Sequence, residues 1–487
     1  MQLLVLALAT TVSLAHAAPS IEAELAELRS DPRAYLEGQP TRFDGSGRAW
    51  APELEIEVAD KIQARRSLRP GTPETAAEPS AYDQASRVVD RLEHASLKSM
   101  ESAGLRKARL VSTPWSGDYW PIYSGGLAKR YADPGFPAKR DWKVNFDYLL
   151  GALGDTDPIE HLSPAEKYDL LVGDSNWSLS RAFQNEGWKY YNGGPKSVPS
   201  WAGYCHGWAI AAYLSPRPGN AIEAVAADGR TKIPFYPHDI KALQTALWGQ
   251  LALSGQIRFV GGRCESDEPA RDANGRIIEG ACSDTNPATW HLAVVNQIGV
   301  AKRSLTFDAT LDSEVWNQPI VGYDYSYFNP KTLLPASKLE DAAVPVNELR
   351  ADRFSPYRSP RARSVVGVIM HMSYTVETKP RRQQIDADAD DAHVTVRYLY
   401  DLELDQNGKI IGGEWYRNRH PDFLWTPWQG SHPASQADAW IDYYHPGTKW
   451  DGKGPIPQGW QQLIPNSSAG GVPAARVVDV LTKLAGE

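Results

Sequence analysis

Cys205 is the residue whose type and setting most clearly predict chemistry in this chain. The chain has 487 residues and three cysteines. Cys264 and Cys282 flank a polar segment and can pair with each other, which leaves Cys205 as the odd thiol. An apolar run from Trp208 to Leu214 predicts a buried helix that begins at the thiol. Because a helix N-terminus stabilises a thiolate, we expect a lowered thiol pKa and a reactive nucleophile.

A thiol nucleophile needs a base that accepts its proton and a third group that orients the base. His291 and Asp308 are the candidates downstream of Cys205. We interpret residues 291–299 and 302–310 as two strands of a hairpin, on which the carboxylate would fix the imidazole tautomer. The register of that hairpin depends on its turn and stays open from sequence. A buried structural cysteine is the alternative interpretation of Cys205.

The N-terminus predicts export. Residues 3–15 form an apolar run that is too short to cross a bilayer, and residues 15–17 offer a small-x-small cleavage site. We therefore expect a signal peptide over residues 1–17 and a secreted protein, either extracellular or periplasmic. No other apolar stretch reaches the length of a membrane span. The net charge of −8 argues against a nucleic-acid partner.

Residues 18–110 differ from the rest of the chain because they are rich in Ala, Glu, Arg and Leu. This composition predicts helices over 21–30 and 81–110, with a Pro/Gly/Thr linker at 67–80 between them. The segment is interpreted as a possible pro-region, an intramolecular chaperone or a helical cap. A helical subdomain without a regulatory role is the alternative.

The remaining chain is richer in aromatic residues and strand patterns. Residues 111–345 are the expected catalytic core, in which a capping box at Ser163 and Glu166 predicts a helix. Residues 346–487 are the expected β-rich C-terminal region, with an Asn-Gly hairpin turn at 407–408. The fold class is therefore α+β.

No cofactor or metal site is predicted. The three cysteines are widely separated and two should be oxidised, so no Cys/His spacing indicates a zinc site. The acidic run of Asp386, Asp388, Asp390 and Asp391 predicts a solvated loop in preference to a calcium site.

The sequence around these residues resembles the transglutaminase elicitor family, known from secreted proteins of oomycete plant pathogens and from bacteria. The matching segments are GYCHGWA, NPATWHLAVVNQIG, FDAT, EVWNQP, PWSGDYWPIYSGG, LSPAEKYD and IGGEWYRNRHPDFLW, which together span about residues 111–428. VWNQP, residues 315–319, also resembles the start of the surface peptide that plants recognise in the oomycete proteins. The following residues, 320–328, diverge from that peptide.

The resemblance implies a papain-like core in which the helix carrying the cysteine packs on an antiparallel sheet. It also implies a Cys-His-Asp arrangement with Cys205 as nucleophile, His291 as base and Asp308 as orienter. The oxyanion donor would be the backbone N–H of Cys205 or the indole of Trp201. The implied reaction joins protein glutamine and lysine side chains by an isopeptide bond through a thioester, so the partners would be proteins that offer these side chains.

Two other functions remain open from sequence. The same three residues would serve a secreted cysteine peptidase or amidase, including a deamidase. A surface-binding protein with a vestigial triad is the non-enzymatic alternative.

Overall fold

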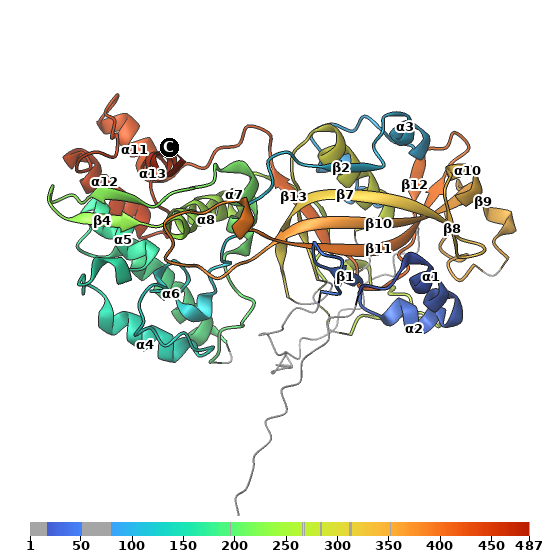
Figure 1. The fold of residues 1–487 in the computed structure, drawn as a ribbon, viewed down its shortest axis with the longest axis horizontal. Coiled ribbons are helices and arrows are strands. Elements are labelled where there is room, and N and C mark those ends of the chain that lie inside the picture. The colour runs from blue at the N-terminus through green and yellow to red at the C-terminus, as the bar shows by residue number, and fades with distance from the viewer. Residues whose placement is uncertain are drawn as a thin grey trace, which may run out of the picture.

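The computed structural model describes residues 17–50 and 79–486, except 195, 265, 267, 283–284, 311–313 and 351. The expected signal peptide, apart from Ala17, and most of the expected linker at 67–80 lie outside the described residues. A helical half and a sheet half lie side by side (Figure 1). The observed architecture is therefore a mixture of helices and antiparallel sheet, as the α+β prediction states.

One antiparallel sheet forms the sheet half of the molecule. Its main strands follow the order β1-β11-β10-β7-β6-β13-β5. They are β1 (Thr41–Phe43), β5 (Ile257–Gly261), β6 (Thr306–Asp308), β7 (Asn317–Asn329), β10 (Ser364–Val376), β11 (Ala392–Leu404) and β13 (Phe423–Pro427). Short strands extend this path: β2 (Lys107–Arg109) and β8 (Leu334–Ala336) pair with β7, β9 (Ala343–Pro345) with β10, and β12 (Ile410–Gly412) with β11.

Both faces of the long strands are covered, so β10 and β11 are buried over most of their length. On β10, Met370 faces a core that includes Trp290, and its neighbour Ile369 faces a second core that includes Leu28. The second core is closed by α1 (Ile21–Ser30) and α2 (Pro32–Glu37). Alternation of side chains along a strand explains why adjacent residues serve different cores. The N-terminal segment is thus part of the covering of the sheet.

The helical half gathers elements from distant parts of the chain, and most of them share one apolar core. It contains α4 (Trp142–Ala152), α5 (Pro164–Val172), α6 (Ser178–Gly193), α7 (Cys205–Leu214), α8 (Pro237–Leu253), α11 (Gln436–Tyr444), α12 (Gln458–Ser468) and α13 (Ala475–Gly486), with the hairpin β3 (Ile222–Val225) and β4 (Lys232–Phe235). The predicted helix at Ser163 is confirmed as α5, including its capping box.

The C-terminal region departs from the predicted β-rich character after Pro427. Its strands β10 to β13 belong to the same sheet as β7, so the expected boundary at residue 345 does not separate two sheets. Residues 436–486 form α11, α12 and α13, which pack in the helical half (Figure 1). The Asn-Gly turn at 407–408 is confirmed, with Gly408 at φ +74°.

Two predicted elements are wrong. The helix expected over 81–110 is replaced by the short turn η1 (Ala85–Arg87), α3 (Leu97–Ser102) and β2, because Val88 and Leu97 enter the sheet core. Of the hairpin expected over 291–310, only the second strand is present, as β6. Residues 287–300 form α9 (Pro287–Val294) and a π-helical turn (Val295–Val300), since Asn286 caps the N-terminus with Pro287 at the first turn.

The acidic run is a solvated loop only in part. The Asp388 side chain is exposed. The side chains of Asp386 and Asp391 are almost fully buried and pair with Arg217, and Asp386 also pairs with Lys241 of α8 at 2.8 Å. This network joins α8 to the segment before β11. Within the described ranges, no group of three or more His, Cys, Asp or Glu side chains could hold a metal ion. No helix in those ranges is long and apolar enough to span a membrane.

Candidate active site

Cys205 is the first residue of α7, as the sequence predicts. Glycines on both sides allow this placement. A Cβ on Gly207 would lie 2.1 Å from the Thr245 carbonyl oxygen of α8, and one on Gly203 would lie 2.6 Å from the Tyr119 carbonyl oxygen. The motif G-Y-C-H-G is therefore dictated by close backbone approach on either side of the thiol.

The Cys205 sulfur is held by the start of β7. The Asn317 side-chain amide donates to Sγ at 3.4 Å, and Sγ lies 3.7 Å from the Val315 carbonyl oxygen. Trp425 of β13 donates its indole N–H to Asn317 Oδ1 at 2.8 Å. Because an indole nitrogen only donates, this bond fixes the amide orientation and leaves Nδ2 facing the sulfur. The structure thus supplies a fixed hydrogen-bond donor to the thiol.

Asp308 lies on the strand next to that amide. In the β6–β7 ladder Asp308 is directly opposite Asn317, so the two side chains share one face of the sheet. Asp308 is fully buried, and its Oδ1 accepts hydrogen bonds from the Trp316 backbone N–H at 2.9 Å and the Thr310 hydroxyl at 3.1 Å. The structure therefore brings the predicted Asp308 close to Cys205, through Asn317.

The thiol is neutral at ordinary pH. Burial, together with the charges of Glu377 and Asp308, raises the pKa of the Cys205 thiol from 9.0 to about 11, although the Asn317 hydrogen bond lowers it in part. The expectation of a lowered pKa at the helix N-terminus is therefore wrong, because the side chain is only 4% exposed. Any reaction at this sulfur requires a proton acceptor at the site.

His291 is not that acceptor in this structure. Its Nδ1 shares a hydrogen bond of 2.7 Å with the Tyr400 hydroxyl, and its ring packs against Tyr325 with centroids 4.8 Å apart. Its Nε2 is buried and makes no hydrogen bond in the described structure. Burial lowers the pKa of His291 to about 3, so the imidazole is neutral. These are the contacts of a core histidine.

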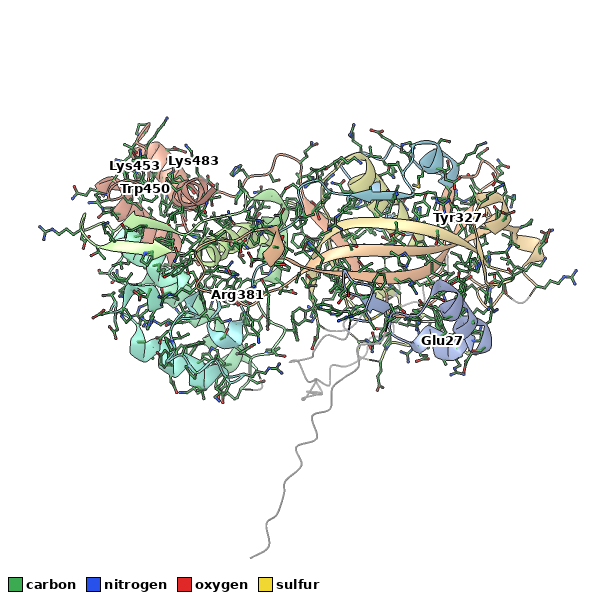
Figure 2. The ribbon with its side chains drawn as sticks, viewed as in Figure 1. Glu27, Tyr327, Arg381, Trp450, Lys453 and Lys483 are labelled. Carbon is green, nitrogen blue, oxygen red and sulfur yellow. A yellow bond between two sulfur atoms is a disulfide. The ribbon has the colours of Figure 1, made fainter. Side chains whose placement is uncertain are left out.

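The separation of His291 from Cys205 follows from β7 itself. Cys205 touches Asn317 at the first position of the strand, whereas His291 touches Tyr325 eight positions later. At about 3.3 Å per residue, roughly 26 Å of strand lies between these two contacts. Tyr327, two residues beyond Tyr325, lies well inside the sheet half (Figure 2). The predicted Cys205–His291 pair is therefore corrected: the imidazole belongs to a helix in the sheet core.

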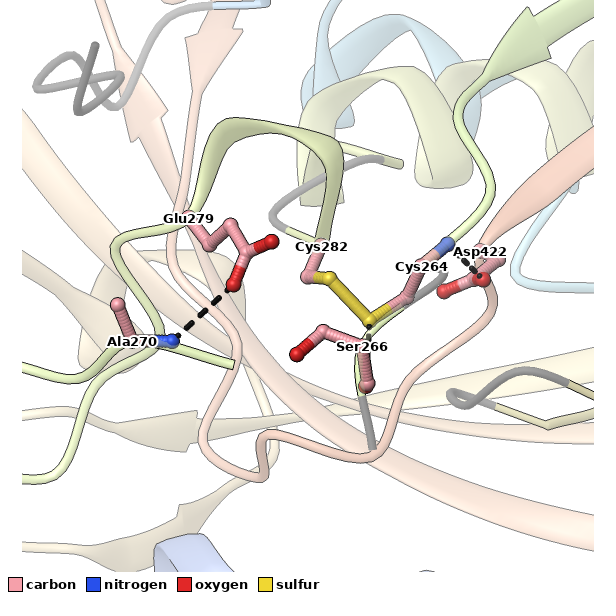
Figure 3. Close-up of a disulfide and its surroundings, with 6 residues drawn as sticks. All are labelled: Cys264, Ser266, Ala270, Glu279, Cys282 and Asp422. Carbon is pink, nitrogen blue, oxygen red and sulfur yellow. Dashed lines mark hydrogen bonds between the residues drawn. A yellow bond between two sulfur atoms is a disulfide. The ribbon is translucent and has the colours of Figure 1, made fainter. Parts of the chain in front are cut away.

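Trp201 and the disulfide lie beside the loop that precedes α7. The Arg263 guanidinium stands over the Trp201 ring at 5.6 Å, one residue before Cys264. The predicted Cys264–Cys282 disulfide is confirmed. Figure 3 shows it next to Asp422, which accepts a 2.7 Å hydrogen bond from the Cys264 backbone N–H. The disulfide thus anchors the chain that supports Arg263 against Trp201.

Sequence reasoning missed two residues of the site, Asn317 and Trp425. Asn317 lies in VWNQP, which we interpreted only as a surface peptide, although Asn317 and Gln318 are about 5% exposed. Trp425 lies in a C-terminal strand with no local pattern that indicates chemistry. Only the sheet order, which places β13 and β7 on either side of β6, could have indicated both residues.

A family model described as transglutaminase elicitor matches residues 90–444 of this chain. Among solved structures, the chain is similar to the GP42 transglutaminase from Phytophthora sojae, with 22% sequence identity and a TM-score of 0.46. That match covers 77% of this chain and 94% of the other. No curated protein matches the chain.

Proposed function

This chain belongs to the transglutaminase elicitor family, and we propose on that premise that it is a cysteine acyltransferase that cross-links protein glutamine and lysine side chains. The observation that carries the proposal is the Cys205 sulfur at the start of α7, held by an Asn317 amide whose orientation Trp425 fixes. The contact of this helix with β7, beside β6, supports a papain-like core as part of the same proposal.

The first half-reaction forms a thioester. Cys205 Sγ attacks the carboxamide carbon of a glutamine, so that a C–S bond forms and the C–N bond breaks. Asp308 takes the thiol proton and passes it to the leaving nitrogen, which departs as ammonia. The Asn317 N–H stabilises the negative charge that develops on sulfur. His291 has no role in these proton transfers, because its ring lies at the far part of β7.

The second half-reaction transfers the acyl group to a lysine amine, with water as the competing acceptor that would give deamidation. Burial of Cys205 and Asp308 supports transfer, because a site that excludes water slows hydrolysis of a thioester. The backbone N–H of Cys205 and the indole of Trp201 remain the proposed oxyanion donors.

We also propose that the protein acts outside the cytoplasm. The Cys264–Cys282 disulfide and membership of a family of secreted proteins support this location. Its substrates would then be proteins that display glutamine and lysine side chains outside the cell.

A non-catalytic binding protein is the second candidate, and one observation favours it. The Cys205 thiol is neutral and enclosed, and its hydrogen bonds in the described structure are to Asn317 and Val315 alone. A vestigial site would show these features, whereas an acyltransferase would need Asp308 to act as the proton acceptor.

The deciding experiment is incorporation of a biotinylated alkylamine into a glutamine-bearing protein such as dimethylated casein. Transfer by the wild-type protein that is lost in Cys205→Ala supports the acyltransferase. Release of ammonia without amine incorporation would indicate a deamidase, and cleavage of the casein chain would indicate a peptidase. Absence of all three activities would favour the binding protein.

A further inference from the structure

The side-chain oxygen of Gln318 is buried and accepts no hydrogen bond from the described residues. This residue follows Asn317 on β7 and is 4% exposed. Its Nε2 donates to both carboxylate oxygens of Glu377, at 2.9 and 3.0 Å. Because a carboxylate only accepts, these bonds fix the amide orientation and assign Oε1 as the atom left over. Gln318 Oε1 is buried and has no hydrogen-bond partner among the residues that the structure describes, which is a costly state for a polar atom.

Glu377 lies at the same level of the sheet as the thiol. It follows the last residue of β10, and the β10–β7 register pairs Tyr374 with Ile320. The charge of Glu377 acts on the Cys205 thiol, which places the carboxylate near the sulfur. Asp308, whose charge acts on the same thiol, lies opposite Asn317 in the β6–β7 ladder. The thiol therefore lies near two carboxylates.

Within the described residues, no cationic side chain forms an ion pair with the Glu377 carboxylate. Its hydrogen bonds come from the neutral amide of Gln318, whereas the nearby Asp118 is paired with Lys129 at 2.8 Å. The Thr378 backbone N–H donates to the Gly117 carbonyl at 2.8 Å and so fixes the chain directly after Glu377. Glu377 as a whole residue is partly exposed to solvent.

A partner that satisfies both groups must donate hydrogen bonds and carry positive charge. An alkylammonium group has three donors and no acceptor, so one N–H can serve Gln318 Oε1 and another the Glu377 carboxylate. We propose that Gln318 and Glu377 form the site that binds the lysine ε-ammonium group of the acyl acceptor and removes its proton. This inference rests on the proposed acyltransferase function and adds the residues that select the acceptor.

The proton balance of the step is as follows. The ammonium group gives one proton to Glu377, which leaves a neutral amine. The amine nitrogen attacks the thioester carbon, so that a C–N bond forms and the C–S bond to Cys205 breaks. The second amine proton moves to the sulfur, which restores the thiol, and Glu377 returns its proton to water.

The test compares a charged acceptor with an uncharged one. Biotin-cadaverine is an ammonium ion at neutral pH, whereas hydroxylamine is uncharged there and needs no proton acceptor of this kind. In Glu377→Gln we expect the KM for biotin-cadaverine to rise about 10- to 100-fold, the effect of one charge-assisted hydrogen bond. Hydroxamate formation from hydroxylamine should change less than about threefold. Glu377→Asp should recover part of the loss, and Glu340→Gln, an exposed carboxylate on α10 (Leu339–Ala342), is the matched control.

Three results would overturn the proposal. Equal loss with both acceptors would assign Glu377 to the structure of the site or to thioester formation. An unchanged KM for biotin-cadaverine would remove the ammonium site while leaving the acyltransferase intact. A wild-type protein that uses neither acceptor would overturn the proposed function itself.

A measurement on the wild-type protein covers the case in which Glu377→Gln does not fold. Acetyl-lysine methylamide should inhibit the hydroxylamine reaction by occupying the ammonium site, and acetyl-norleucine methylamide, which lacks the amine, should not. Equal inhibition by the two compounds would refute the site.

Discussion

The alkylation rate of Cys205 should rise steeply with pH, because its thiol is neutral in the folded protein. Burial raises the pKa of this thiol from 9.0 to about 11. At pH 7 the thiolate fraction of the folded protein is then roughly 100-fold smaller than that of an unperturbed cysteine. Since the thiolate is the reactive form, iodoacetamide should modify the folded protein at least about 100-fold more slowly than the unfolded chain.

The assay is mass-spectrometric counting of carbamidomethyl groups between pH 7 and 11, with the disulfide intact so that Cys205 is the one free thiol. The logarithm of the rate should rise by about one for each pH unit up to pH 10. The same protein unfolded in non-reducing urea gives the reference rate, and Cys205→Ser gives the background.

Two variants test the causes of the shift. Asp308→Asn removes a negative charge that raises the thiol pKa, so alkylation at pH 8 should become faster. Asn317→Ala removes the donor that lowers the pKa, so alkylation should become slower. A wild-type rate that levels off at or below pH 8 would refute the reasoning, because it would show a thiolate stabilised by a partner that this structure does not place at the sulfur.

Three further substitutions test how the structure holds the site. His291→Leu should lower the free energy of unfolding by about 1–3 kcal/mol through loss of a buried hydrogen bond, yet leave the alkylation profile unchanged; a changed profile would restore its catalytic assignment. Trp425→Phe should reduce amine incorporation about tenfold by releasing the amide it orients, with little change in urea unfolding. Gly207→Ala should destabilise the protein by about 1–3 kcal/mol because its Cβ would meet the Thr245 carbonyl, whereas Gly151→Ala, with open space around it, should not; equal unfolding midpoints for the two would contradict the close approach of α7 to α8.

Local sequence patterns correctly predicted the helices that are determined by a few adjacent residues. The capping box at Ser163 produced α5, and the apolar run after Cys205 produced α7. The Cys264–Cys282 pairing followed from the position of these two cysteines on either side of one polar segment. In each case the residues that determine the structure lie close together in the sequence.

The secondary-structure prediction failed for the segment at 291–299, where the structure depends on residues outside the apolar run. HLAVVNQIG has the apolar content of a strand, but Asn286 and Pro287 start a helix before it, and the sheet core accepts Trp290 from that helix. The prediction of a lowered pKa for the Cys205 thiol failed for a similar reason. The dipole of α7 can be predicted from sequence, whereas the burial that outweighs it comes from β7 and β13.

The effect of burial on pKa also explains why carboxylates, and not an imidazole, would suit the proton transfers of the proposed reaction. A lysine ammonium group has an unperturbed pKa of about 10.4, and burial raises the pKa of Glu377 to about 7. Moving a proton between them therefore costs about 5 kcal/mol, against a total barrier of about 16 kcal/mol for a turnover near 10 per second. His291, with its pKa lowered to about 3, would make the same transfer cost about 10 kcal/mol. Burial therefore acts in opposite directions on the two groups, since it makes a carboxylate more basic and an imidazole less basic. The proposed thioester site would therefore be better served by Glu377 at the end of β10 than by a buried histidine, even if that histidine lay within reach.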